Sequence, residues 1–274
     1  MRRRHLSLVI AIIFMIAGFG LLFYPDISNL QKSMVHDAIL SEYEGMIAQL
    51  SPDEINHHLY RAATHNAQLS PQQFALGYHA QLPDDYNQIL YVQGVMAWVD
   101  IPAIDVSLPV LHGTMPSTLG QGVGHLEGTA LPIGGYSTHS VLTTHSGLTG
   151  VRLFSDLHLL SYGDIFFISV LGQKLAYKVD HIYTVLPNDI DLLRVTPGKD
   201  FVTLITCTPI HVNTHRLLVR GTRIPYVPYM EDDIEPITIS TGFRMRLAIF
   251  TVFLVVNFFL WRGKRKLPVI PQAT

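Results

Sequence analysis

The sequence predicts a mainly β domain, either a closed barrel or a sandwich, with a helical segment before it and a membrane helix at each end of the chain. Three observations lead to this prediction. A basic start is followed by an apolar run, a second apolar run is followed by a basic end, and many short β-branched or aromatic runs lie between them. The expected boundaries are 1–5 cytoplasmic, 6–24 transmembrane, 25–91 helical, 92–230 β domain, 231–242 linker, 243–261 transmembrane and 262–274 cytoplasmic.

The first apolar run extends from Leu6 to Tyr24 and follows "MRRRH". A run of this length is enough, or nearly enough, to cross a hydrocarbon core of roughly 30 Å. A cleaved signal peptide has a shorter apolar core and then a small-residue cleavage site. This run ends instead in "LLFYPD". The pattern therefore favours an uncleaved membrane helix over a cleaved signal.

The second apolar run, Leu247 to Trp261, is short for a full crossing and is followed by "RGKRK". Phe243, Met245 and snorkelling of the neighbouring arginines extend it, and the alternative is an amphipathic helix lying on the membrane. Because basic clusters flank the far ends of both runs, both termini are predicted to be cytoplasmic and the residues between the runs to face outward.

The charged residues nearly balance, with a net charge of −2 when histidine is neutral. A nucleic-acid-binding surface needs an excess of basic residues, so this balance gives no indication of such a partner. Residues 25–91 are polar and helix-like, and "SPDE" at Ser51 to Glu54 is a capping box that predicts a helix start. "SPQQ" at Ser70 to Gln73 repeats the signature. The histidines of this region show no compact metal spacing and are predicted to lie on solvated helix faces; they are His57, His58, His65 and His79.

The character of the chain changes to β near Tyr91. Runs such as "GVMAWVDIP", "HSVLTTH", "DIFFISVLGQKLAYKVDHIYTVL" and "FVTLITCTP" are short and are separated by turn residues. This spacing is typical of a barrel or a sandwich. "VLGQKL" predicts a hairpin turn at Gly172-Gln173.

Cys207 is the only cysteine of the chain and lies where the run "FVTLITC" meets the loop "TPIHVNT". An outward-facing domain lies in a compartment where disulfides form, yet this thiol has no partner in the chain. Three interpretations remain open: a buried inert cysteine, an intermolecular disulfide, or a reactive nucleophile at a strand end. A nucleophile needs neighbours that favour the thiolate.

Arg216 and His145 are the candidate neighbours. If the strands on either side of the "TPIHVNT" loop pair, Arg216 lies beside Cys207, where a guanidinium favours the thiolate and can bind an oxyanion. His145 closes another β-type run, and an imidazole can move the protons of acyl transfer. His139, at the start of that run, is the weaker candidate for the base. A metal site made of His125, His139, His145 and Cys207 is an alternative, although it lacks a short ligand pair.

"TLITC" at Thr203 to Cys207 resembles the TLxTC signature of sortases, the cell-wall transpeptidases of Gram-positive bacteria. "TPIHVNTHRLLVRGTRI" is similar to the sortase segment that carries the arginine, and "GVGHLEGTALPIGGYSTHSVLTTHSGL" to the segment that ends at the histidine. The resemblance runs from about Gly94 to Tyr226. The two membrane runs resemble class C, the pilus-assembling sortases.

The resemblance implies a closed eight-stranded sortase barrel that uses no cofactor, with Cys207 as nucleophile, His145 as general acid and base, and Arg216 as oxyanion or substrate stabiliser. It implies cleavage of an LPxTG-like sorting signal through a thioester, followed by transfer to a pilin lysine or a cell-wall amine. The reaction of a membrane-bound cysteine protease is the alternative. The candidate substrate-binding residues are Thr144, Thr206, Thr208 and Asn213.

The chain departs from the family pattern at three places. The Asp-Pro-aromatic lid triplet of class C has no counterpart between Tyr24 and Tyr91, so the cysteine is expected to be loosely covered, with Phe74 and Tyr86 as the aromatics able to cover it. Ser146 stands where the family usually has arginine, and Ile210-His211 where it usually has Tyr-Gly.

Overall fold

The structure is a computed structural model, and it describes residues 2–69, 83–148, 151–231, 233–237, 247–253 and 255. The chain divides into two compact units. One comprises residues 1–27 and 238–274, and the other comprises residues 28–237. The β domain lies within the second unit and carries the candidate site.

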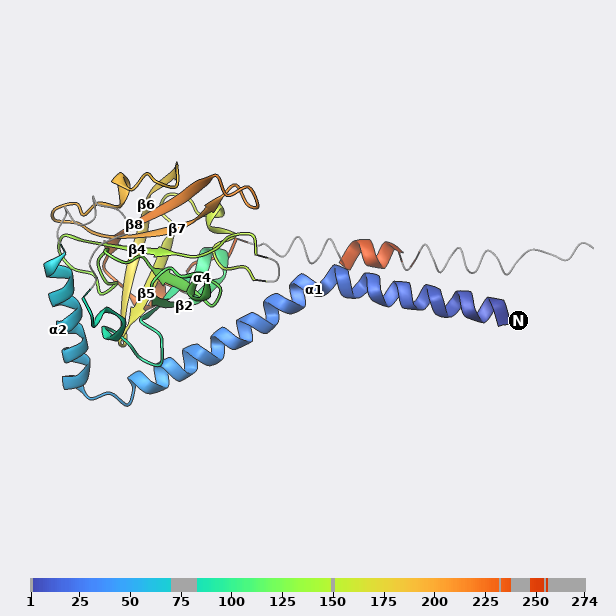
Figure 1. The fold of residues 1–274 in the computed structure, drawn as a ribbon, viewed down its shortest axis with the longest axis horizontal. Helices are drawn as coiled ribbons and strands as arrows, with labels where there is room; N and C mark the ends of the chain where they lie inside the picture. Colours follow the sequence, from blue (N-terminus) through green and yellow to red (C-terminus); the bar gives the residue numbers. More distant parts are fainter. Residues whose placement is uncertain are drawn as a thin grey trace, which may run out of the picture. The chain divides into compact units, whose positions relative to one another are not determined.

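The β domain is a closed barrel of eight strands, which confirms the barrel and excludes the sandwich (Figure 1). The strands follow the order β1-β2-β3-β4-β7-β8-β6-β5 around the barrel. Two neighbouring pairs are parallel, β2 with β3 and β4 with β7, and the other pairs are antiparallel. The strands are β1 (Ala97–Ile101), β2 (Val106–His112), β3 (Val123–His125), β4 (Thr138–Thr143), β5 (Ile165–Val170), β6 (Gln173–Val185), β7 (Asp200–Thr208) and β8 (His215–Ile224).

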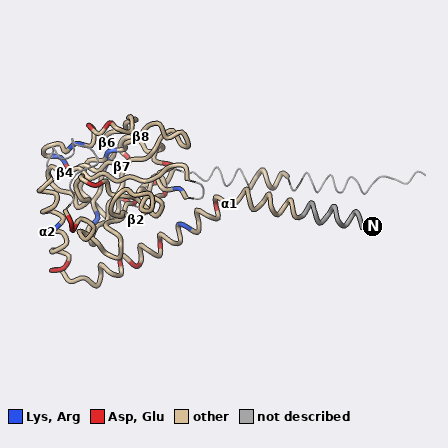
Figure 2. Tube along the Cα trace, viewed as in Figure 1, with Lys and Arg blue, Asp and Glu red and all other residues tan. Residues whose placement is uncertain are grey.

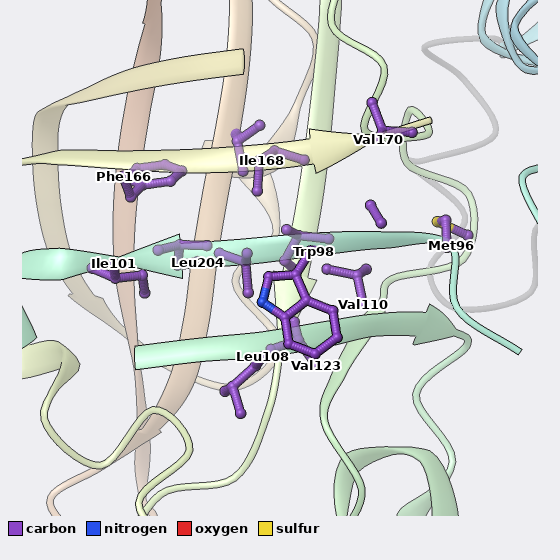
Figure 3. Packing of buried hydrophobic residues seen from close by; sticks show 14 of the residues in the cluster. Met96, Trp98, Ile101, Leu108, Val110, Val123, Phe166, Ile168, Val170 and Leu204 are labelled. Atoms are coloured by element: carbon purple, nitrogen blue, oxygen red, sulfur yellow. The ribbon is translucent and has the colours of Figure 1, made fainter. Parts of the chain in front are cut away.

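One large apolar cluster fills the barrel and extends beyond it to the helices that precede it in the chain, since Tyr43 and Ala62 belong to it, and Figure 3 shows part of it around Trp98. Trp98 is fully buried, and its indole Nε1–H donates to the Ser107 hydroxyl at 2.7 Å, so its one polar atom is satisfied. Along β7, Val202 and Leu204 belong to this cluster, whereas Ile205 belongs to a second cluster that includes Leu193 of the β6–β7 connection. Because side chains alternate between the two faces of a strand, residues 203, 205 and 207 point outward from the barrel.

The second cluster lies on that outer face and is covered by the connection between β6 and β7. It contains Leu126, Val141, Leu193, Ile205 and Leu218. Leu193 comes from the short 3-10 helix η4 (Asp191–Leu193) of this connection. The outer face of β4, β7 and β8 is therefore apolar between its two ends.

Short helices connect several strands: η2 (Pro102–Ile104), α4 (Pro116–Leu119) and η3 (Leu157–Leu159). Two more flank the barrel, η1 (Tyr86–Gln88) before β1 and η5 (Pro228–Met230) after β8. The helix α2 (Pro52–Gln68) begins at the predicted capping box: the Ser51 side chain accepts from the Glu54 N–H, and the Glu54 carboxylate accepts from the Ser51 N–H. The Asn66 side chain ties α2 to the barrel by bonding both the N–H and the C=O of Leu131, at 2.7 and 3.1 Å.

The first helix, α1 (Arg2–Ile47), contains the N-terminal apolar run. Within the described residues, it is the one helix long and apolar enough to cross a membrane, by length and composition, over Ile13–Ile47. Figure 2 shows that α1 has no charged residue from Ile13 to Pro25, and the first charged residue after this stretch is Asp26. The structure is thus compatible with membrane anchoring through this helix.

The second predicted membrane run lies mostly outside the described residues. Residues 247–253 and 255 are helical, and within the same unit the Phe250 ring lies 5.0 Å from the Phe19 ring of α1. This described length is too short to test a crossing, so the second span stays a prediction. "SPQQ" and Phe74 also lie outside the described residues.

The predicted hairpin turn at Gly172-Gln173 is wrong by one residue. Val170 pairs with Gln173, so the two turn residues are Leu171 and Gly172, with φ of +46° and +78°. Two positive φ values define a type I′ turn, which favours glycine, asparagine or aspartate at its two central positions. Leu171 takes the first of these positions although a positive φ is unfavourable for leucine. It is 2% exposed, and its N–H donates to the Tyr43 hydroxyl of α1.

His65 is not on a solvated helix face as predicted, because it is 5% exposed at the contact between α2 and the barrel. Its ring lies 6.2 Å from the ring of Tyr86, whose hydroxyl bonds His125 Nδ1 at 2.7 Å. His125 Nε2 contacts the Ala130 carbonyl at 2.9 Å. Since a carbonyl only accepts, Nε2 carries the proton and Tyr86 donates to Nδ1. Tyr86 is therefore a buried anchor, and its predicted role as a cover over the cysteine is wrong.

Two buried histidines make the fold sensitive to acid. Burial lowers the pKa of His125 to about 3 and the pKa of His139 to about 4, against an ordinary value near 6.5. The unfolded chain therefore binds more protons than the folded chain between these values, and stability falls as the pH drops below about 6.5. From pH 7 to pH 5 we expect each histidine to lower the free energy of unfolding by about 2 kcal/mol.

Urea unfolding at several pH values measures this loss. His139→Gln should flatten part of the slope, whereas His57→Gln, at an exposed position of α2, is the matched control and should leave it unchanged. A free energy of unfolding that stays constant between pH 7 and pH 5 would contradict the prediction.

Candidate active site

Cys207 and Arg216 face each other across an antiparallel strand pair. Cys207 is the second-to-last residue of β7 and Arg216 the second residue of β8, and the strand register pairs them directly. Directly opposed residues in an antiparallel pair project to the same face. The pair therefore lies at one end of the barrel on its outer face, with both side chains half-buried. The strand pairing expected from the sequence is confirmed.

His145 reaches the same end of the barrel from the other side of β7. The parallel register of β4 and β7 pairs Thr143 with Ile205. His145 and Cys207 each lie two residues further along, so continuing that register sets them side by side. The Thr144 N–H donates to the Ile205 carbonyl at 3.2 Å, and the Ser146 hydroxyl donates to the Cys207 carbonyl at 2.6 Å. The structure thus brings the backbone of all three candidate catalytic residues together.

The loop between β7 and β8 holds the arginine. Arg216 Nη1 donates to the carbonyls of Asn213 and His215 at 3.2 and 3.0 Å. Asn213 itself is exposed and has a φ of +59°, which asparagine tolerates better than most residues. The guanidinium is therefore oriented by the loop that follows the cysteine, and its planar fork leaves other N–H groups of the side chain for a ligand.

The four candidate substrate-binding residues fall into two pairs. Thr144 and Thr206 are buried, and their hydroxyls donate to the carbonyls of Gly122 and Thr144 at 2.7 and 2.9 Å. Such contacts fasten neighbouring backbone segments. Thr208 is half-buried and Asn213 exposed, so these two are open to a ligand.

A pocket of about 300 Å³ opens beside Cys207. Its lining comes from β7, the loop after the cysteine, β8 and the segment around η3: Ser155, His158, Thr206, Cys207, Thr208, Pro209, Ile210 and Leu217. Sequence reasoning missed Ser155 and His158. Their run "FSDLHLL" carries no motif, and only the folded chain brings them to the cysteine.

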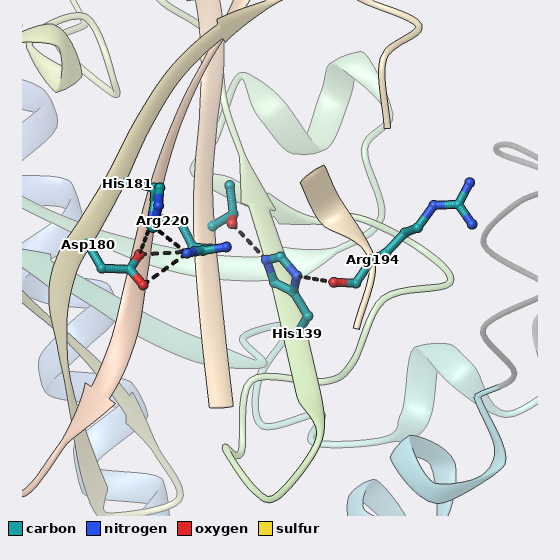
Figure 4. A network of polar contacts seen from close by, with 6 residues as sticks. His139, Asp180, His181, Arg194 and Arg220 are labelled. Carbon is teal, nitrogen blue, oxygen red and sulfur yellow. Dashed lines mark hydrogen bonds and ion pairs between the residues drawn. The ribbon is translucent and has the colours of Figure 1, made fainter. Parts of the chain in front are cut away.

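His139 is at the far end of the same strands and is not a candidate base. It is 1% exposed, its Nδ1–H donates to the Arg194 carbonyl at 3.1 Å, and its Nε2 accepts from the Thr203 hydroxyl at 2.7 Å. Figure 4 shows the ring aimed at the Arg194 carbonyl, close to the ion pair that Arg220 makes with Asp180 at 2.9 Å. His139 thereby holds the β6–β7 connection to the barrel wall.

The alternative metal site is contradicted by this arrangement. His125 and His139 use both ring nitrogens in buried hydrogen bonds at separate places in the barrel. In the part of the chain that the structure describes, no group of three or more His, Cys, Asp or Glu side chains is placed to hold a metal ion.

Comparisons with known proteins point to one family. The family model for the sortase domain matches residues 99–224. The solved structure of sortase C1 of GBS Pilus Island 1 is 40% identical with a TM-score of 0.64, covering 70% of this chain and 99% of that one. Sortase C-1 from Actinomyces oris is 47% identical with a TM-score of 0.58, covering 64% of this chain and 100% of that one.

A curated relative gives a more distant match. Sortase A of Streptococcus agalactiae serotype III is 29% identical over 130 residues, which are 46% of this chain. The chain spans about half the length of that relative, at 52%. The similarity to it is thus weaker and less extensive than the similarity to the solved sortase C structures.

Proposed function

This chain belongs to the sortase family of cysteine transpeptidases, with class C sortases as its structural neighbours, and we propose that it is a membrane-anchored enzyme that polymerises pilins. Its substrate is an LPxTG-like sorting signal, and its acceptor is the ε-amine of a pilin lysine. In this proposal both termini are cytoplasmic, both apolar runs cross the membrane of a Gram-positive bacterium, and the barrel faces outward. The observation that supports the proposal most directly is that Cys207, Arg216 and His145 lie at the same end of the barrel.

The first half of the reaction forms a thioester. The Cys207 thiolate attacks the carbonyl carbon of the scissile peptide bond, and the resulting oxyanion lies against the free N–H groups of Arg216. His145, protonated, gives its proton to the departing glycine amine as the C–N bond breaks. Cys207 and Arg216 lie opposite each other in β7 and β8, and this suits the step because the nucleophile and the oxyanion donor are on the same face of the sheet.

The second half transfers the acyl group. The neutral lysine amine attacks the thioester carbonyl, His145 accepts the proton that the amine loses, and Cys207 leaves as a thiolate. Water competes with the amine at this stage, so the outcome depends on how well the acceptor is held near the sulfur. The pocket beside Cys207, lined by Ser155 and His158, is a suitable place for an acceptor side chain.

A two-acceptor assay tests the proposal. The full-length protein in detergent is mixed with an LPxTG peptide and either a lysine-containing pilin peptide or a cell-wall stem peptide, and the products are identified by mass spectrometry. We expect an isopeptide product with the pilin lysine. A conjugate formed only with the cell-wall amine would indicate an anchoring enzyme, and cleavage without any conjugate would indicate a protease; either result would overturn the proposal.

A further inference from the structure

The turn that carries His145 is linked to the nucleophile by a side chain. In the β4–β7 ladder, the Thr144 N–H donates to the Ile205 carbonyl. One step further, at residues 146 and 207, the Cys207 carbonyl receives the Ser146 hydroxyl at 2.6 Å. The side chain therefore continues the ladder at the point where the backbone of β4 turns away from β7.

This bond is short and shielded. Ser146 is 9% exposed, and a hydrogen bond in a site with little water is stronger and better oriented than one at the surface. The turn is also held from its other side, because the Phe154 N–H donates to the His145 carbonyl at 3.3 Å and the Gly147 N–H donates to the Ser155 hydroxyl at 2.9 Å. Residues 145–147 are thus clamped between β7 and the segment before η3.

The clamp leaves little freedom around Ser146. Gly147 has a φ of +71°, and a Cβ at that position would lie 2.5 Å from the Ile210 side chain and 3.3 Å from the His211 ring. The loop after the cysteine therefore packs on the same turn. Among these contacts, the Ser146 bond is the one made to the nucleophile's own residue.

We propose that Ser146 is a positioning residue that sets the His145 imidazole against the Cys207 sulfur by fixing the peptide of Cys207 to the residue after His145. The inference rests on the proposed function, because it assigns the geometry of the same site. Proton transfer and thiolate stabilisation both depend on this distance, and a displacement of about 1 Å from the reactive geometry can lower the rate up to about a hundredfold. The Ser146 hydroxyl bonds the backbone carbonyl of Cys207 and not its sulfur, so its role is to position the reacting groups.

Three variants test the proposal. Ser146→Ala removes the hydroxyl, Ser146→Thr restores it, and Thr143→Val is the matched control. Thr143 makes the same kind of bond between the same strands, from its hydroxyl to the Ile205 carbonyl at 3.2 Å, but two residues before His145 on β4. The readouts are kcat and KM for cleavage of an LPxTG peptide and the pH dependence of Cys207 alkylation by iodoacetamide.

We expect Ser146→Ala to lower kcat about tenfold, the effect of one hydrogen bond, with KM within about twofold of wild type. We also expect its alkylation profile to move to higher pH, because a displaced imidazole stabilises the thiolate less. Ser146→Thr should recover most of both losses, and Thr143→Val should keep the wild-type alkylation profile.

The proposal is overturned if Ser146→Ala keeps the wild-type kcat and alkylation profile, or if Thr143→Val shifts the profile equally, since the strand pair as a whole would then be responsible. The alkylation readout needs no peptide substrate. If wild type fails to cleave or transfer any peptide while Ser146→Ala still shifts the profile and Ser146→Thr restores it, the proposed function fails and the positioning role stands.

Discussion

The Cys207→Ala variant is expected to lose both cleavage and transfer, by at least about 10⁴-fold, while the barrel stays folded. Removing the attacking group of a catalytic unit costs about as much as removing the whole unit, which explains the size of the loss. The fold should survive because Cys207 is half-buried at the end of β7 and the change deletes a single heavy atom outside the large apolar cluster. Peptide cleavage followed by chromatography and a thermal melt measure the two outcomes.

Cys207→Ser is the sharper variant, because it nearly keeps the side chain's size and shape and replaces only the sulfur. Serine should be nearly as inactive as alanine, since a hydroxyl stays protonated at neutral pH, whereas the attack assigned to Cys207 is made by an anionic sulfur. If either variant retained pilin assembly in cells, the chain would act as a scaffold rather than as an enzyme.

The Arg216→Lys variant is expected to lose about 10²–10³-fold in kcat, nearly as much as Arg216→Ala, which is the loss typical of one oxyanion donor. The guanidinium uses Nη1 to hold the carbonyls of Asn213 and His215, and its planar fork places further donors at fixed angles to them. A lysine ammonium can satisfy the loop or face the oxyanion, but its geometry does not serve both. Steady-state kinetics on a sorting-signal peptide measures the difference.

Arg223→Lys is the matched control on the same strand. Arg223 lies 3.5 Å from Asp200 at the other end of β8 and is one-third exposed, so an ammonium can replace its charge there. This variant should keep near-wild-type rates. Near-full activity of Arg216→Lys would mean that position 216 supplies only a positive charge, and the assigned oxyanion role would be wrong.

Local sequence signals predicted the parts of the site that depend on neighbours along the chain. The β-branched run before Cys207, the turn residues after it and the resumed strand at Arg216 predicted a hairpin-like pairing, and the register confirms it. The capping box at Ser51 was predicted for the same reason, because both of its hydrogen bonds span three residues. The presence of short strands over residues 97–224 followed from short apolar runs between turn residues, whereas their order around the barrel did not.

Histidine roles were harder to predict, because burial is not visible in a spacing pattern. His65 lies on a helix that looks solvated, yet α2 docks on the barrel along that side, and Tyr86 meets His125 across 39 positions of the chain. His139 and His145 lie six residues apart, at the start and just beyond the end of one strand; the sequence favoured His145 by that position, and the structure shows the environment of each. His139 is bonded to Thr203 and covered by the β6–β7 connection, whereas His145 is half-exposed beyond the end of β4.

The sequence by itself determined the strand content, the apolar N-terminal run and the antiparallel pairing of Cys207 with Arg216, because each depends on residues close along the chain. The tertiary structure alone decided which strand runs parallel to β7 and in which register, since that pairing joins residues 62 positions apart. It also decided that Ser146 would donate to the Cys207 carbonyl. Parallel strands are joined by long crossovers, so their register is set by packing of the whole barrel and not by a turn that a short motif could reveal.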